Sequence, residues 1–311
     1  MSGHNRLLTH SEWSARAATH RDRMNALVGP YFAERRAGVA HPVVDFLFTY
    51  YAARPAQVTR WHPGFGVSLE RARRYTGLRG YIVDDDGTAT VSQEHLESRI
   101  DLLDATLAIT QATAGRAPRF GCFGLHEWAM VYRSDANRHP HPLRLGAVET
   151  DAVVERSGLR CTHFDAFRFF TDPARPRNAM DLTRADAVAN EQPGCLHATM
   201  DLYRYCLRLS PLIGSDLLGD CFELALTARE LDMRASPYDL TGVLDMTGRP
   251  YEPVPIETAE GRAQYAAEQT VVAERGAVLR ESVIARCDDL RKRCRGASPM
   301  EQPGRYNICA G

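Results

Sequence analysis

The segment "SDLLGDCFELALTARELDM", Ser215–Met233, decides the fold class of this chain. When it is wound as a helix, its apolar residues cover most of the circumference. That pattern predicts a central helix that is buried on nearly every side. The hydroxyl of Ser215 is expected to cap its first turn. The sequence therefore predicts a core built mainly from helices.

Helical patterns continue on both sides of this segment. The preceding stretch "CLHATMDLYRYCLRL" (195–209) is helical in period and stops before Pro211. After two loops, Thr258 is expected to cap a last helix that runs into a charged tail. We expect a helical N-terminal part (1–115) and a helical C-terminal part (173–311).

The middle of the chain has a different composition. The stretches "RFGCFGLHEWAMVY" and "DAVVERSGLRCTHFDAFRFF" are rich in β-branched and aromatic residues, and "ERSGLR" is a candidate hairpin turn. These features predict a small, mostly antiparallel sheet over residues 116–172. The expected architecture is a single α+β domain, 1–311, that is predominantly helical with this sheet at its centre.

Composition excludes several classes of function. The formal net charge is −1 and Lys292 is the only lysine, so a Schiff-base or P-loop mechanism is not expected. The near-neutral charge also makes nucleic acid an unlikely partner. The eight cysteines form no CxxC pair. Without a membrane-length apolar run or an N-terminal secretory h-region, we expect no membrane partner and a cytoplasmic location.

Three pairs of ionisable residues interrupt apolar segments. If the middle segments are strands, the second pair shares one face, and the third pair lies one helical turn apart. A carboxylate beside a histidine fixes the tautomer that acid–base catalysis needs. We expect the three histidines to converge and these residues to be catalytic. The pairs are His126 with Glu127, His163 with Asp165, and His197 with Asp201.

Each pair also has a structural explanation as a satisfied group in the core, and two functional readings remain. The HExxH zinc motif is absent, because residue 130 is Met130. We prefer a metal-free acid–base pocket without a cofactor. The alternative is a metal-dependent hydrolase or oxygenase with iron, zinc or manganese. Its ligands would be His126, His163, His197 and Asp165, whereas His139 and His141 are weaker candidates in a loop-like context.

The expected substrate is a small anionic molecule. Arginines in the same segments suit anions, because the guanidinium group binds carboxylates and phosphates in a bidentate manner. The reaction would be hydrolysis, elimination or intramolecular substitution, as in hydrolases and lyases. A second protein subunit is left open. The expected substrate-binding residues are Arg133, Arg204, Tyr205, Arg234 and Tyr238. The alternative for Arg234 and Tyr238 is a surface network with Glu230, Asp232 and Asp239.

Several segments together resemble a known group of bacterial proteins. The segments are "HPVVDFLFTYY", "WHPG", "FGLHEWAMVYR", "THFDAFRFF", "PGCLHATMDLYRY" and "ELDMRASPYDL". The group is common in actinobacteria and is named 3-methyladenine DNA glycosylase. The resemblance implies a monofunctional DNA N-glycosylase that releases alkylated bases with an aspartate and water. A fainter resemblance to a component of azinomycin-type aziridine-forming enzymes implies strained-ring formation in natural-product biosynthesis.

One short motif bears on the glycosylase alternative. Helix-hairpin-helix glycosylases have a P-G-x-G turn before a helix and a catalytic aspartate further along the chain. Here "HPGFGVSLERARR" supplies Pro63, Gly64 and Gly66, and "YIVDDDG" supplies the acidic triplet 84–86. The stretch "VSLERARRY" is predicted to be helical. We expect the match to be a coincidence, because the triplet looks like a turn.

Overall fold

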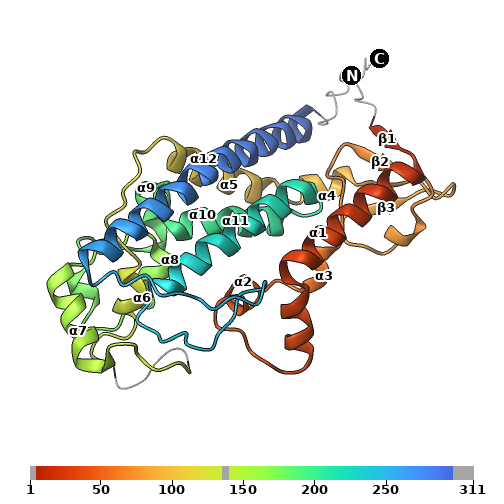
Figure 1. Ribbon diagram of the computed structural model, residues 1–311. Helices are drawn as coiled ribbons and strands as arrows, with labels where there is room; N and C mark the ends of the chain where they lie inside the picture. Colours follow the sequence, from red (N-terminus) through yellow and green to blue (C-terminus); the bar gives the residue numbers. More distant parts are fainter. Residues whose placement is uncertain (1–4, 135–139, 297–311) are drawn as a thin grey trace, which may run out of the picture.

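Two adjacent helices occupy the middle of the molecule (Figure 1). In the computed structural model, which describes residues 5–134 and 140–296, these are α10 (Leu196–Leu209) and α11 (Ser215–Arg234). The long helix α12 (Ala259–Gly296) packs against both of them and against α5 (Ile100–Ala114). The predicted central helix is thus confirmed, and its neighbours supply the surfaces that bury it.

The ends of these helices follow from local chemistry, with one difference from expectation. The Thr258 hydroxyl accepts a hydrogen bond from the Gly261 amide (3.0 Å), as expected for the residue before α12. Ser215 is instead the first residue of α11, after Gly214. Its hydroxyl accepts from the His62 amide (2.8 Å) and donates to the Arg60 carbonyl (3.2 Å), so it anchors another segment.

The other helical segments are shorter, apart from the first. Among the described residues, no helix is both long and apolar enough to cross a membrane. The segments are α1 (His10–Arg36), α2 (Asp45–Thr49), α3 (Pro55–Thr59), α4 (Gln93–Glu97), α6 (Leu125–Ala129), α7 (Gly146–Ser157), α8 (Phe164–Phe167) and α9 (Ala187–Asn190), with 3₁₀ turns at Arg73–Tyr75, Arg175–Arg177 and Arg184–Asp186.

A four-stranded sheet completes the fold. Its strands run in the order β1 (Arg6–Leu8), β2 (Val67–Leu69), β4 (Ala89–Val91) and β3 (Tyr81–Val83). The β1–β2 pair is parallel and the other two pairs are antiparallel. The predicted class, a mostly helical α+β fold with a small, mostly antiparallel sheet, is therefore confirmed.

The position predicted for the sheet is wrong. The strands come from residues 6–91 and lie at one side of the helices, whereas residues 116–134 and 140–172 contain no strand (Figure 1). Gly124 at φ 73° starts α6, and Gly158 at φ 69° ends α7, so "ERSGLR" ends a helix and turns no hairpin. The five residues of α6 are all buried, and a segment buried all round shows no helical period.

The motif resembling helix-hairpin-helix proteins has a different structure here. The turn with Gly64 and Gly66 leads into β2, and the residues after it form a 3₁₀ turn in place of the predicted helix. Asp84 and Asp86 lie in the tight turn between β3 and β4. The sequence match is therefore not a helix-hairpin-helix unit.

Candidate functional site

Three histidines from separate segments converge in the core. The ring centroids of His126 and His197 are 4.6 Å apart, and those of His163 and His197 are 5.3 Å apart. Their exposed fractions are only 2–6%. His126 lies on α6, His163 directly before α8, and His197 in the first turn of α10. The predicted convergence is confirmed.

The carboxylates that the histidines contact differ from those predicted. His163 Nε2 is bonded to Asp201 Oδ2 (3.2 Å), and Asp165 accepts from Arg204 Nη1 (2.8 Å). The predicted His163–Asp165 and His197–Asp201 pairs therefore do not form. The first prediction assumed a strand, but residue 163 precedes a short helix and the two side chains diverge.

The predicted acidic partner of His126 is also wrong. Glu127 accepts a hydrogen bond from Arg229 Nη1 (2.7 Å). His126 Nε2 instead lies 2.8 Å from Asp232 Oδ1. Asp232 is fully buried on α11 and so does not belong to a surface network.

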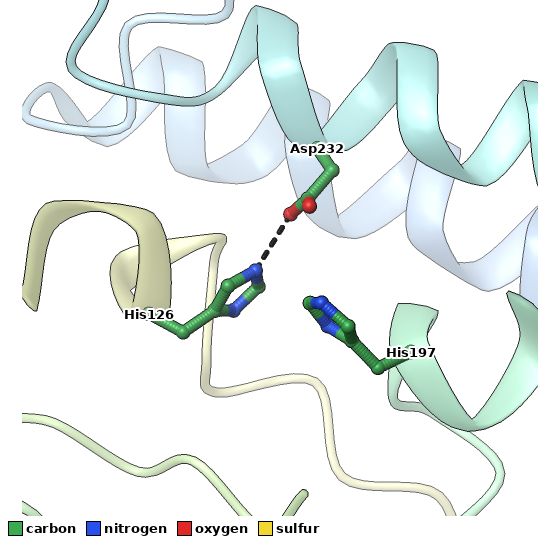
Figure 2. A group of neighbouring side chains, drawn as sticks. All are labelled: His126, His197 and Asp232. Carbon is green, nitrogen blue, oxygen red and sulfur yellow. Dashed lines mark ion pairs between the residues drawn. The ribbon is translucent and has the colours of Figure 1, made fainter. Parts of the chain in front are cut away.

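His126, His197 and Asp232 form a group that we call the inner triad. Their side chains come from α6, α10 and α11 and point toward one another (Figure 2). One ligand-type atom from each residue lies within 4.8 Å of those of the other two. Histidine nitrogens and a carboxylate oxygen in this arrangement suit a divalent transition-metal ion.

The inner triad lacks directed hydrogen bonds between its members. His126 Nε2 and Asp232 Oδ1 are 2.8 Å apart, yet the ring N–H direction does not meet the oxygen. Among the described residues, His197 Nδ1 has no hydrogen-bond partner either. A buried polar atom without a partner costs about 1–3 kcal/mol. The triad is thus assembled without the bonds that would satisfy it as a structural cluster.

Neighbouring groups hold two members of the triad in place. Arg229 Nη1 donates to Asp232 Oδ2 (2.9 Å) and also binds Glu127, while its guanidinium lies 4.4 Å from the Phe46 ring centroid. On the other side, His126 Nδ1 lies 3.3 Å from Cys122 Sγ. Such contacts orient the ring and the carboxylate, as outer partners do around metal ligands.

The third histidine belongs to a hydrogen-bonded group beside the triad. Asp201 Oδ2 accepts from His163 and from Arg204 Nη2 (2.5 Å), and Asp201 Oδ1 accepts from Tyr51 Oη (3.2 Å). Glu191 Oε1 lies 3.4 Å from His163 Nε2. Unlike Asp232, Asp201 has directed bonds at both oxygens. In this group, which we call the His163–Asp201 pair, the Asp201 carboxylate is satisfied by protein donors, whereas His163 Nδ1 has no partner among the described residues. Ligand-type atoms of His163, Glu191 and Asp201 also lie within 4.8 Å of one another.

Burial and neighbouring charges give the three histidines different pKa values. Burial lowers the pKa of His197 well below its usual value, and nearby His126 lowers it further. Burial also opposes protonation of His126, but Asp232 and Cys122 together raise its pKa well above the usual value. For His163, Glu191 and Asp201 outweigh burial and raise the pKa. At neutral pH His197 is the neutral ring.

Some of the predicted substrate-binding residues lie elsewhere. Arg204 contacts Asp201 in the His163–Asp201 pair, and it also contacts Tyr205 Oη (3.5 Å). Arg133 is exposed and pairs with Glu155 (2.7 Å). Arg234 pairs with Glu268 (2.6 Å) and, together with Tyr238, lines a separate cavity of about 210 Å³. His141 belongs to neither group of histidines and acids, and His139 lies outside the described residues.

Four residues that contact the three histidines or their carboxylate partners were missed from the sequence or assigned elsewhere. They are Tyr51, Glu191, Arg229 and Asp232. A signal was present for two of them. Arg229 and Asp232 lie three residues apart on a helix that is apolar on most sides, so they share one buried face. Glu191 lies in a loop, and its place depends on the tertiary fold.

Comparisons with known proteins give no further guide to this site. No family model matches the chain, and no curated protein or solved structure matches it.

Proposed function

We propose that this chain is an enzyme acting on a small molecule and that the inner triad holds a divalent metal ion at its reaction centre. One observation carries the proposal. His126 Nε2 and Asp232 Oδ1 approach to 2.8 Å without a directed hydrogen bond. Neighbouring ligands of an octahedral ion with bonds of about 2.1 Å are about 3.0 Å apart. The spacing and direction of these two atoms suit a shared ion.

The charges around the triad support the same proposal. Asp232 and Glu127 contribute two negative charges, and Arg229 contributes one positive charge, all in the core. A divalent ion with neutral histidines brings this set to one positive charge. A bound hydroxide would then make it neutral. Metal ions in closed protein sites lower the pKa of bound water toward neutrality. The charge balance thus favours an ion that carries hydroxide.

Three protein ligands leave coordination positions for water and substrate. The reaction class that fits is hydrolysis, in which bound water adds its oxygen to the substrate and the leaving group takes a proton. We propose that His163 supplies that proton. Asp201 and Glu191 lie at its Nε2, and its Nδ1 has no partner among the described residues. Donation from Nδ1 leaves the ring hydrogen-bonded to Asp201.

A metal-free acid–base pocket is the second candidate, and one observation favours it. With His126 protonated, the ion pairs among His126, Asp232, Arg229 and Glu127 balance their charges without any ion. The histidines and carboxylates would then catalyse hydrolysis, elimination or intramolecular substitution of an anionic substrate by proton transfer alone.

Metal content distinguishes the two candidates. The purified chain is incubated with iron(II), manganese, cobalt or zinc, dialysed and analysed for bound metal. The metal proposal predicts close to one ion per chain in the wild type and little in Asp232→Asn or His126→Ala, since ligand loss weakens binding strongly. His20→Gln is the control, because His20 is equally buried but bonds only the Val58 carbonyl (2.8 Å).

The outcomes are separable. Wild-type protein that retains no ion, while staying folded, overturns the metal proposal and leaves the acid–base pocket. If the wild type, the control and both triad variants all keep their ion, the metal lies elsewhere. That result also contradicts the metal proposal.

A further inference from the structure

A second region, away from the inner triad, collects positive charge. A cavity of about 390 Å³ opens between the end of α10, the start of α5 and the segments around α3 and β3. Four arginines from four separate segments line it, and none of the lining residues is acidic. They are Arg60, Arg79, Arg99 and Arg208, and we call this cavity the arginine pocket.

These arginines lack counter-charges in the protein. Within residues 5–134 and 140–296, no carboxylate lies within ion-pairing distance of any of the four guanidinium groups, in contrast to Arg23, Arg144 and Arg204. Burial lowers the pKa of Arg99, and the charges of Arg79 and Arg208 lower it further. Like charges gathered in one cavity repel one another, and a bound anion would relieve this repulsion.

The start of α5 adds to the positive potential. Arg99 directly precedes this 15-residue helix, and Leu102 in its first turn also lines the cavity. The start of this helix, where the helix dipole is positive, therefore forms part of the cavity wall. Together these groups suit a compact ligand with several negative charges.

We propose that the arginine pocket binds the phosphate groups of a small, multiply charged ligand such as one with a pyrophosphate moiety. Guanidinium groups bind phosphate oxygens in a bidentate manner, and several can share one pyrophosphate. This binding does not depend on a metal in the inner triad.

The adjoining surface favours a compact ligand over a long polyanion. A neighbouring cavity shares Arg60 and adds Arg21 and Arg74. Arg21 already pairs with Asp22 (3.3 Å), and the Arg74 guanidinium lies 4.2 Å from the Trp13 ring centroid. Of the two added arginines, one has a carboxylate partner and the other stacks on an aromatic ring, so four of the five arginines without a carboxylate partner in these two cavities line the arginine pocket.

One side chain links the wall of the pocket to the candidate reaction centre. Tyr51 lines it, and the Tyr51 hydroxyl donates to Asp201 of the His163–Asp201 pair. Arg208 and Asp201 lie on the same helix, seven residues apart, which corresponds to about 10 Å. A ligand in the pocket would therefore contact a residue that is hydrogen-bonded to the His163–Asp201 pair.

Calorimetric titration with inorganic pyrophosphate tests the proposal. It uses the wild-type full chain without added metal ion in a buffer free of multiply charged anions, and the pocket variants separate this binding from any contribution of the triad. We expect saturable binding that weakens at least about tenfold in Arg99→Gln and in Arg208→Gln, because a charge-assisted hydrogen bond contributes about 1.5–3 kcal/mol. Arg36→Gln, an exposed arginine on α1, is the charge-matched control and should bind as the wild type does.

Two results would overturn the proposal. One is no heat of binding at millimolar pyrophosphate, or equal affinity in the two pocket variants and the control. The other comes from fluorescence anisotropy with short single-stranded and duplex DNA. If DNA binds more tightly than pyrophosphate and the same two variants abolish that binding, the pocket is part of a nucleic-acid surface. Because neither Arg99 nor Arg208 belongs to the inner triad, failure here leaves the metal proposal untouched.

Discussion

At the scale of single residues, the cluster shows that sequence spacing identifies which groups are unusual but not which groups meet. His126, His163 and His197 stood out because each interrupts an apolar stretch. Their real carboxylate partners lie 106 residues away for His126 and 38 away for His163. A buried charge needs a partner, but that partner can come from any part of the chain. The tertiary fold therefore determines which carboxylate lies beside each histidine.

Two carboxylates beside His163 should respond differently to neutralisation. Asp201→Asn is expected to lower the free energy of unfolding by about 3–5 kcal/mol, because it removes the charge that faces Arg204 and His163. Glu191→Gln should cost less than half as much, because burial already raises the pKa of the Glu191 carboxyl and weakens its ionised form.

Urea unfolding at pH 7 of both variants and the wild type measures this difference. Equal losses, or a larger loss for the Glu191 variant, would show that Asp201 is not the main counter-charge of the group.

At the scale of elements, hydrophobic periodicity identified the long helices. It failed where a helix or strand is short. α10 and α11 are 14 and 20 residues long, so several turns reveal the pattern. α6 and α8 have five and four residues, too few to separate a helical period from alternation. The strands have three residues each and were missed for the same reason.

The start of α12 makes a prediction about one glycine. A Cβ atom at Gly261 would lie 2.0 Å from the Pro255 carbonyl oxygen and 2.4 Å from its carbon, both of them backbone atoms. Gly261→Ala should therefore lower stability by about 3 kcal/mol, since the helix start must shift.

Gly296→Ala at the end of α12 is the control, because its Cβ would meet nothing within 4 Å. It should be neutral or stabilising by about 0.5–1 kcal/mol. Thermal melting of both variants gives the comparison, and similar melting temperatures would contradict the close approach at Gly261.

At the scale of the whole molecule, the sequence was sufficient for the fold class but not for where its parts meet. The parallel β1–β2 pair joins residues about sixty positions apart, and no local pattern specifies such a pairing. The candidate site likewise draws on α6, α10, α11 and the segment before α8. Helix packing brings these elements together, so the inner triad became visible only in three dimensions.

Anomalous diffraction at the absorption edge of the bound metal tests the metal site most directly. Crystals are grown from the wild-type chain after incubation with the metal it retains. We predict one strong peak bonded to a nitrogen of His126, a nitrogen of His197 and an oxygen of Asp232, with both bonds to nitrogen near 2.1 Å. No peak at the inner triad, together with a directed hydrogen bond from His126 to Asp232, would contradict the account.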